Sequence, residues 1–191
     1  IYGYPDHAGQ PKPDLLYWFP DINTGTFTGQ NQGPWSVSGN GSYVVYGGEF
    51  TRVNNVKQQG LVRFAVATVA PNKIAPALKS TTWPLTAKSF VAGQVRLTFG
   101  TNWDADNETL TYNLYRQSTT GTPIYSTTVT TPFWLPKTLS FTDTGVSPGQ
   151  AVRYRVVAVD PFGNQSMSDW VNITVASTGT LSPYASDVLN D

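Results

Sequence analysis

The side chains best suited to chemistry in this sequence are carboxylates and amides gathered in two short segments. Asp104, Asp106 and Asn107 form the first segment, and Asp160 begins the second, which Gly163 closes. Carboxylate and amide oxygens are the ligands that Ca²⁺ prefers, so Asp104, Asp106, Asn107 and Asp160 are candidate calcium ligands. The alternative is ordinary turn chemistry, because Asp and Asn side chains accept hydrogen bonds from the backbone amides of tight turns.

A second candidate site is the aromatic pair Phe133 and Trp134, which Leu135 and Pro136 follow. An exposed aromatic ring stacks on the apolar face of a sugar, and this pair is the one we expect to be partly exposed. The sequence therefore offers Phe133 and Trp134 as a glycan contact. The alternative is a structural role, since most tryptophans of small β domains lie in cores or interfaces.

The sequence offers little for catalysis. It contains no cysteine, which excludes thiol nucleophiles and thiolate metal sites. Its single histidine, His7, lies in a segment rich in proline and glycine that predicts no element rigid enough for a catalytic triad. The two glutamates, Glu49 and Glu108, fall in different predicted domains, so no paired-carboxylate glycosidase site is expected. We expect no enzyme activity from this chain.

Composition and charge limit the classes of partner. Charged residues make up 13% of the 191 residues, and the formal net charge is zero. A polar but weakly charged surface suits an extracellular protein, and the lack of cysteine favours a bacterial source over an animal one, or a cytosolic protein. No basic face is present to bind nucleic acid, and no apolar run approaches the length that spans a membrane.

Short apolar and polar alternations predict an all-β protein. Glycine, proline, asparagine and aspartate separate the alternating runs, and three prolines between Pro71 and Pro84 indicate a boundary. We expect a first domain over residues 1–75, a linker over 76–84, a β-sandwich over 85–177 and a linker to a following domain over 178–191. The clearest alternating runs span residues 95–99, 110–114, 152–158 and 171–175.

The second half of the chain resembles a fibronectin type III domain of the kind found in bacterial secreted proteins. Three stretches carry the resemblance: VRLTFGTNWDADNETLTYNLYR, SFTDTGVSPGQAVRYRVVAVD and FGNQSMSDW. The resemblance implies a seven-stranded sandwich in which Trp103 is the buried tryptophan of the second strand. It also places Val152 where the family has its corner tyrosine, so that hydrogen bond is expected to be missing. A shared core is expected from Trp103, Tyr112, Leu114, Tyr154, Val156 and Ile173.

The same resemblance bears on the calcium hypothesis. In its register, Asp104 and Asp106 lie in the loop after the second strand, and Asp160 lies in the loop after the sixth. Both loops emerge at one pole of the sandwich. The register thus brings the candidate calcium ligands within reach of one another.

The first part of the chain resembles a β-propeller repeat of large actinobacterial surface proteins. The resemblance rests on the stretch YVVYGGEFTRVNNVKQQGLVRFA, in which Phe50 is expected to pack between blades. About one and a half blades are present, whereas a closed propeller needs roughly four to eight. The remaining blades are therefore expected in the parent protein, or a second copy pairs with the open edge.

These features predict a non-catalytic structural, adhesive or binding module of a larger secreted or cell-surface bacterial protein. Its expected partner is a protein or a cell-surface glycan. Two alternatives stay open: an accessory, substrate-targeting module of a secreted hydrolase, or a subunit of an extracellular fibre or toxin assembly. The start at Ile1 and the tail after Ser182 lead us to expect further sequence at both ends.

Overall fold

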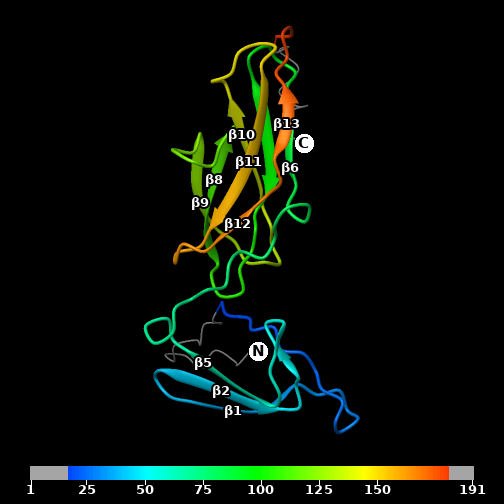
Figure 1. The fold of residues 1–191 in the computed structure, drawn as a ribbon, viewed down its shortest axis with the longest axis vertical. Coiled ribbons are helices and arrows are strands. Elements are labelled where there is room, and N and C mark those ends of the chain that lie inside the picture. Colours follow the sequence, from blue (N-terminus) through cyan, green and yellow to red (C-terminus); the bar gives the residue numbers. More distant parts are fainter. Residues whose placement is uncertain (1–16, 181–191) are drawn as a thin grey trace, which may run out of the picture.

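A computed structural model describes residues 17–180 as an all-β protein in two units along one long axis (Figure 1). This part of the chain contains thirteen strands and no helix, as the alternating sequence predicts. None of its elements is a helix long and apolar enough to cross a membrane. His7 and the tail after residue 180 lie outside the described residues.

The N-terminal unit is a three-stranded antiparallel sheet with a small hairpin. The sheet has the order β1-β2-β5, and the hairpin joins β3 to β4. Asn54 and Asn55 form the hairpin turn with φ angles of 48° and 62°, a left-handed conformation that asparagine tolerates. The strands are β1 (Pro34–Gly39), β2 (Tyr43–Gly48), β3 (Arg52–Val53), β4 (Val56–Lys57) and β5 (Leu61–Ala65).

Glu49 orders the loop that leads into this sheet. One carboxylate oxygen accepts the Thr28 amide at 2.8 Å, and the other accepts the Thr28 hydroxyl and the Gln32 amide, both at 3.0 Å. Burial pushes the pKa of Glu49 upward, but these hydrogen bonds outweigh it and the pKa is lowered. Beside Glu49, the Phe50 ring is almost completely buried, and Val53 is the other buried apolar side chain in the described part of this small unit.

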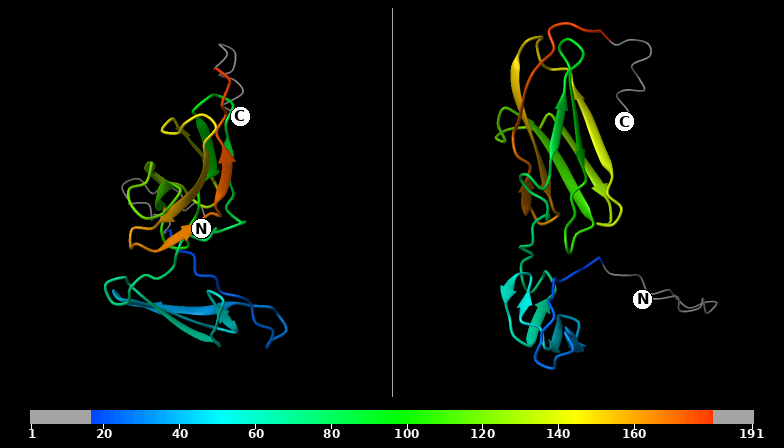
Figure 2. Two further views of the ribbon diagram at one scale, coloured as in Figure 1. Left: turned by 45° about the horizontal axis from the view of Figure 1, so that its top comes forward. Right: turned by 90° about the vertical axis from the view of Figure 1, so that its right-hand side faces the viewer.

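The C-terminal unit is a β-sandwich. One sheet has the order β10-β7-β6, and the other has the order β12-β11-β8-β9 with β13 paired to β11 (Figure 2). Because β12 and β13 pair with successive parts of β11, they share one strand position. The strands are β6 (Leu85–Lys88), β7 (Val95–Gly100), β8 (Thr109–Arg116), β9 (Tyr125–Thr130), β10 (Thr138–Asp143), β11 (Ala151–Val159), β12 (Gln165–Met167) and β13 (Val171–Thr174).

The predicted alternation is confirmed in the runs that form β7, β8 and the first half of β11. Buried side chains of β7 face those of β8 and β11 across the sandwich, and the intervening residues lie nearer the surface except Val157, which is also buried. Burial of this apolar surface is the main force that holds the two sheets together. The core members on these three strands are Val95, Leu97, Phe99, Leu110, Tyr112, Leu114, Val152, Tyr154, Val156 and Ala158; Trp83, Leu85, Val146 and Val175 complete the core, and Ile173 is partly buried against it.

The prediction that Trp103 fills the core is wrong. Strand β7 ends at Gly100, and Trp103 lies beyond it in a loop, partly exposed. The buried tryptophan is Trp83, which packs edge-on against Phe99 at a centroid distance of 6.3 Å. Its indole Nε1 donates to the Gly100 carbonyl oxygen at 2.8 Å, which satisfies the one polar atom of the ring.

Residues 76–84, predicted as a linker, are bonded to the sandwich. The Ala77 amide donates to the Trp103 carbonyl oxygen at 2.8 Å. Asn102 forms a reciprocal pair with Leu78, accepting its amide at 2.9 Å and donating to its carbonyl oxygen at 2.8 Å. The proline-rich segment is therefore part of the sandwich. The Asn102 side-chain amide satisfies the backbone N–H and C=O groups of Leu78, as a neighbouring strand would do.

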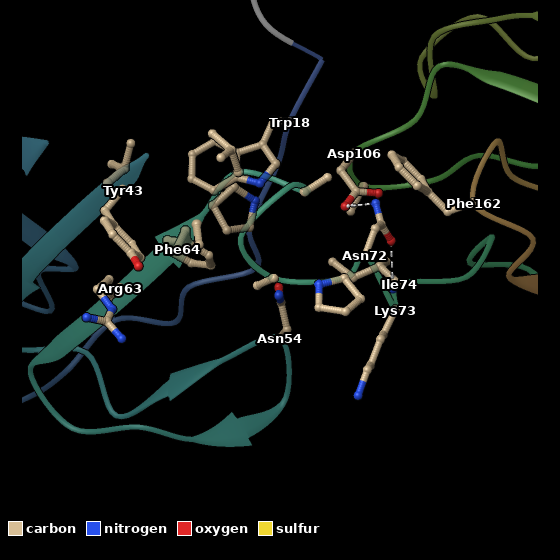
Figure 3. Close-up of a pocket in the computed structure, with 18 of the residues that line it drawn as sticks. Trp18, Tyr43, Asn54, Arg63, Phe64, Asn72, Lys73, Ile74, Asp106 and Phe162 are labelled. Carbon is tan, nitrogen blue, oxygen red and sulfur yellow. Dashed lines mark hydrogen bonds between the residues drawn. The ribbon is translucent and has the colours of Figure 1, made fainter. Parts of the chain in front are cut away.

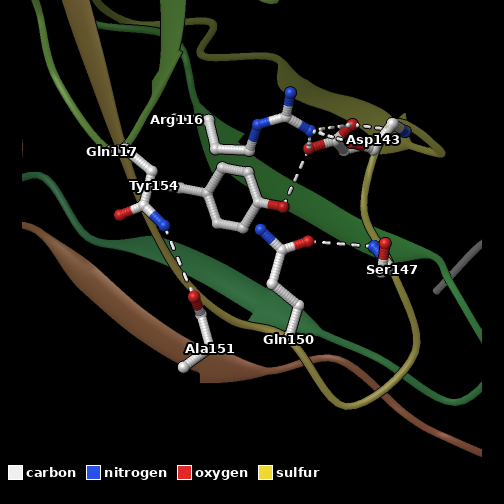
Figure 4. Close-up of polar contacts among 8 residues, drawn as sticks. Arg116, Gln117, Asp143, Ser147, Gln150, Ala151 and Tyr154 are labelled. Atoms are coloured by element: carbon white, nitrogen blue, oxygen red, sulfur yellow. Dashed lines mark hydrogen bonds and ion pairs between the residues drawn. The ribbon is translucent and has the colours of Figure 1, made fainter.

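Tyr154 forms a polar link inside the sandwich (Figure 4). Its buried hydroxyl donates to Asp143 Oδ2 at 2.8 Å, and Arg116 pairs with the same carboxylate at 3.0 Å. Arg116 also donates to the Gly145 carbonyl oxygen at 2.6 Å. Burial, and then the neighbouring carboxylate, raise the pKa of Tyr154, so the hydroxyl stays a donor. These contacts join β8, β10 and β11. Tyr154 itself lies two residues after Val152, the position where the family has its corner tyrosine.

Candidate functional site

The two units meet through a short segment that precedes the N-terminal sheet. The Phe19 amide donates to the Ala105 carbonyl oxygen at 2.6 Å, in the loop between β7 and β8. Five aromatic rings gather around this contact, and we call them the junction aromatic cluster. Its members are Tyr17, Phe19, Trp103, Phe133 and Trp134, with centroid separations from 4.9 to 6.5 Å.

The structure places the predicted glycan pair in this cluster. Phe133 packs edge-on against Phe19 at 5.2 Å, and Trp134 packs against Phe133 at 4.9 Å. Phe133 and Trp134 are nevertheless 45% and 57% exposed. The pair therefore combines an interface contact with open ring surface, and glycan binding by it stays a prediction.

Asn72 links the connecting segment to both loops of the pole. Its Nδ2 donates to Asp106 Oδ2 at 2.8 Å (Figure 3). Its Oδ1 accepts Asn164 Nδ2 at 3.3 Å. Asp106 belongs to the loop between β7 and β8, whereas Asn164 belongs to the loop between β11 and β12. One amide side chain thus bonds to two loops that are far apart in the sequence.

Two of the candidate calcium ligands bond to their own turns. Asp160 Oδ1 accepts the amides of Phe162 and Asn164, both at 2.8 Å, and Oδ2 accepts Asn164 Nδ2 at 2.7 Å. Asp106 Oδ1 accepts Asn107 Nδ2 at 2.8 Å. The two backbone amides that Asp160 accepts are the turn chemistry that the sequence offered as the alternative to metal binding, and the other two contacts are bonds between side chains.

Asp104 differs from its neighbours because it is completely buried. Its Oδ1 accepts the Asp106 amide at 3.2 Å, and its Oδ2 has no hydrogen-bond partner. Burial, then the side chain of Asp106, and to a smaller extent the charge of Asp160 raise the pKa of Asp104 to about 7. The carboxyl group therefore gains a negative charge only near neutral pH.

Within residues 17–180, no group of three or more histidine, cysteine, aspartate or glutamate side chains is arranged to hold a metal ion. The pole does gather Asp104, Asp106, Asn107 and Asp160, as the predicted register requires. Calcium binding by these four residues stays a prediction. The carboxylates of Asp106 and Asp160 accept hydrogen bonds from amides of the protein, whereas Asp104 Oδ2 accepts none among the described residues.

A cleft of about 660 Å³ lies between the two units (Figure 3). The sheet side contributes Trp18, Tyr43 and Phe64, while Asp106 and Phe162 close the sandwich side. The Trp18 ring is stacked on Tyr46 at 6.3 Å and meets Phe64 edge-on at 4.9 Å, so its orientation is fixed. Sequence reasoning missed this cleft because its walls come from segments far apart in the chain.

Polar side chains on the cleft wall are oriented by contacts of their own. Asn40 Oδ1 accepts the amides of Ser42 and Tyr43 at 2.9 and 3.0 Å, and Asn54 Oδ1 accepts the Asp21 amide at 2.9 Å. Neither Nδ2 group donates to another residue in the described part of the chain. Because the oxygens are held, the orientation of both amide groups is fixed, and both line the cleft with N–H donors that no described residue uses.

Arg63 adds a cation to the same wall. Its guanidinium lies over the Tyr43 ring, 4.7 Å from the centroid. No carboxylate among residues 17–180 lies within 4.0 Å of its nitrogens. The stacking fixes the plane of the guanidinium, and its five N–H donors leave it capable of binding hydroxyl or carboxylate oxygens.

No protein-family model matches the chain, and no curated protein sequence matches it either.

Proposed function

We propose that this chain is a non-catalytic binding or adhesive module of a larger secreted or cell-surface bacterial protein. The open edge of the N-terminal sheet carries this proposal. Every residue of β1 is exposed, and Trp35 and Val37 keep 55% and 65% of their surface open. No described strand pairs with the outer edge of β1. Large apolar side chains on an unpaired edge strand are typical of a surface that another polypeptide covers.

The strand order supports a fibronectin type III-like assignment for the sandwich. The first, second and fifth strands of the sandwich, which are β6, β7 and β10, form one sheet. The other sheet contains β8, β9, β11 and the position that β12 and β13 share. That division agrees with the resemblance in the sequence. The link from Tyr154 to Asp143 then takes over the role of the family's corner tyrosine.

The N-terminal sheet supports a blade-like assignment in a similar way. Strands β1 and β2 are followed along the chain by the buried Phe50 and a tight hairpin, and β5 then completes the three-stranded sheet, whose core around Phe50 is small. Such a sheet gains stability when a further strand or a neighbouring blade covers it. In this proposal the covering strands belong to the parent protein or to a second copy of the chain.

The junction gives the sandwich its role. Asn72 and the junction aromatic cluster hold the N-terminal unit against one pole of the sandwich. The sandwich then acts as a spacer that keeps the open sheet in a fixed orientation. The hydrolase alternative assigns the same geometry to a targeting module, and differs only in requiring a catalytic domain elsewhere in the protein.

A binding assay tests the proposal. The purified chain, labelled with a fluorophore, is added to intact cells of the producing organism, and its self-association is followed by sedimentation. We expect retention on cells or association between copies, and loss of either in the double variant Trp35→Ser, Val37→Ser. Unchanged unfolding of the sandwich serves as the control for folding. A wild-type chain that neither binds nor associates, yet hydrolyses a glycan, ester or peptide, would contradict the proposal.

A further inference from the structure

The cleft between the two units has the size and chemistry of a ligand site. Its volume of about 660 Å³ lies inside the range of roughly 300–1,000 Å³ that is typical of small-molecule sites. Aromatic rings and short aliphatic side chains supply most of the wall, and a few oriented polar groups interrupt it. That combination is what a specific binding site requires, because the apolar wall gives affinity and the polar groups select the ligand.

The polar groups identify the class of ligand. Asn40 and Asn54 present N–H donors whose orientation is fixed by the bonds that their oxygens accept. Asn107 presents the opposite polarity, because its Nδ2 is held by Asp106 and its Oδ1 has no donor among the described residues. A ligand that meets all three must both accept and donate hydrogen bonds along its length. A hydroxyl group does both.

Charge excludes the strongly anionic alternatives. The wall carries two cations, Arg63 and Lys73, and one carboxylate, Asp106. The wall therefore has a net charge of +1, which is too small to bind a polyphosphate or a nucleic-acid backbone. The remaining recognition elements are the rings of Trp18 and Phe64, which offer apolar surface beside the hydrogen-bonding groups. Sugar rings carry apolar C–H faces edged with hydroxyl groups, and they match this arrangement.

We propose that the cleft between the N-terminal sheet and the sandwich binds an oligosaccharide. Asn40, Asn54 and Arg63 hydrogen-bond its hydroxyl groups, and the aromatic wall packs against its ring faces. This site is distinct from Phe133 and Trp134, the pair at which the sequence predicts glycan contact. The proposal rests on the proposed function, because it assigns one chemical class to the partner of a binding module.

The first experiment is direct titration. The purified chain is titrated with cellohexaose, xylohexaose, mannohexaose and chitohexaose, and binding is measured by calorimetry and by saturation-transfer NMR. We expect at least one of the four to bind with a Kd below about 1 mM, which corresponds to roughly 4 kcal/mol. Absence of binding to all four would overturn the proposal.

Two isosteric variants locate the site. Asn40→Asp and Asn54→Asp keep the oxygen that accepts the local backbone amides, and aspartate tolerates the positive φ of residue 54. Each variant loses the N–H donors of one amide and gains one negative charge, which the control below matches. We expect each to weaken oligosaccharide binding by about 3- to 10-fold, the effect of one hydrogen bond.

Asn113→Asp is the matched control. Asn113 lies on β8, outside the cleft, and its Oδ1 accepts the Ser126 hydroxyl at 2.7 Å. The change alters the net charge equally and should leave affinity unchanged. Equal affinity in wild type and both cleft variants, or a loss found only in Trp134→Ala, would overturn the cleft assignment. Retention of the chain on cells without oligosaccharide binding would reject this inference while the proposed function stands.

Discussion

The Tyr154 hydroxyl and the Asp143 carboxylate form a 2.8 Å hydrogen bond in the interior of the sandwich, and the Arg116 guanidinium pairs with the same carboxylate oxygen at 3.0 Å. Because Asp143 is buried, each of its partners offsets part of the cost of burying its charge. The contact connects β10 to β11 across the two sheets. Removal of one atom, the Tyr154 hydroxyl oxygen, should therefore change the free energy of unfolding by a measurable amount.

Tyr154→Phe removes that one oxygen and leaves the ring. We expect the free energy of unfolding to fall by about 1.5–3 kcal/mol, the range for a hydrogen bond to a charged group. Urea denaturation measures the loss. Tyr115→Phe on β8 is the control, since its hydroxyl bonds to no described residue, and it should change stability by less than about 0.5 kcal/mol. Equal effects of the two changes would mean that the Asp143 contact contributes nothing.

Trp83→Ala should be the most costly single truncation in the sandwich. The ring is 1% exposed, contacts Phe99 and Tyr112, and bonds through Nε1 to the Gly100 carbonyl oxygen. We expect a loss of about 3–5 kcal/mol, because the change leaves a cavity and removes the hydrogen bond to the Gly100 carbonyl oxygen. Chemical denaturation followed by circular dichroism gives the value.

Trp103→Ala is the matched comparison for this experiment. The Trp103 ring is partly exposed and contacts only Phe133 among the aromatic residues of the described chain. It should therefore lose less than half of what Trp83→Ala loses. A larger loss for Trp103 than for Trp83 would restore the core position that the sequence suggested.

These two tryptophans show how far the sequence could predict the fold. Alternation in β7, β8 and β11 identified the buried faces, because a period of two follows directly from strand geometry. It could not choose between Trp83 and Trp103, since both lie outside the regular strands. The choice depends on where β7 ends and on the bonds that Asn102 makes to Leu78.

The candidate site was predictable only in part. Asp104, Asp106 and Asp160 were identified from residue type, and the register placed their loops at one pole. The role of Asn72 was not predictable, because it bonds to Asp106 and Asn164 from a segment expected to be a linker. The cleft depends on how the two units meet, and no local pattern in the sequence encodes that arrangement.

Glu49→Gln should make the N-terminal unit insensitive to mild acid. The pKa of Glu49 is lowered in the folded state, so folding favours its carboxylate form. The stability that this carboxylate adds is therefore present above the pKa of the unfolded state and is lost as the pH falls through the pKa of the folded state. Hydrogen exchange of the Thr28 and Gln32 amides reports the effect. Wild-type protection should fall below about pH 4, near the unperturbed pKa of glutamate. In Glu49→Gln the protection should be weaker at pH 7 and should not change between pH 7 and pH 3.

Asp104→Asn should stabilise the protein at neutral and alkaline pH. The pKa of Asp104 is raised to about 7, chiefly by burial and next by the Asp106 side chain, so folding favours the protonated form. The stability that the protonated Asp104 adds is therefore fully present below its unfolded-state pKa of about 3.9. This stability is lost as the pH rises through the pKa of the folded state. Over that window the wild type should lose up to about 1.4 kcal/mol per pH unit relative to Asp104→Asn. The two proteins should be equally stable near pH 3, and Asp104→Asn more stable at pH 8.

The measurement is a series of urea unfolding curves from pH 3 to pH 8, repeated with millimolar CaCl₂. If Ca²⁺ raises the wild-type stability at pH 8 and leaves Asp104→Asn unchanged, a cation satisfies the buried carboxylate and the calcium hypothesis is correct. If the gap between the two proteins persists in Ca²⁺, the proton alone neutralises Asp104. Parallel pH curves for both proteins would show that Asp104 ionises normally in the folded state, contrary to its burial.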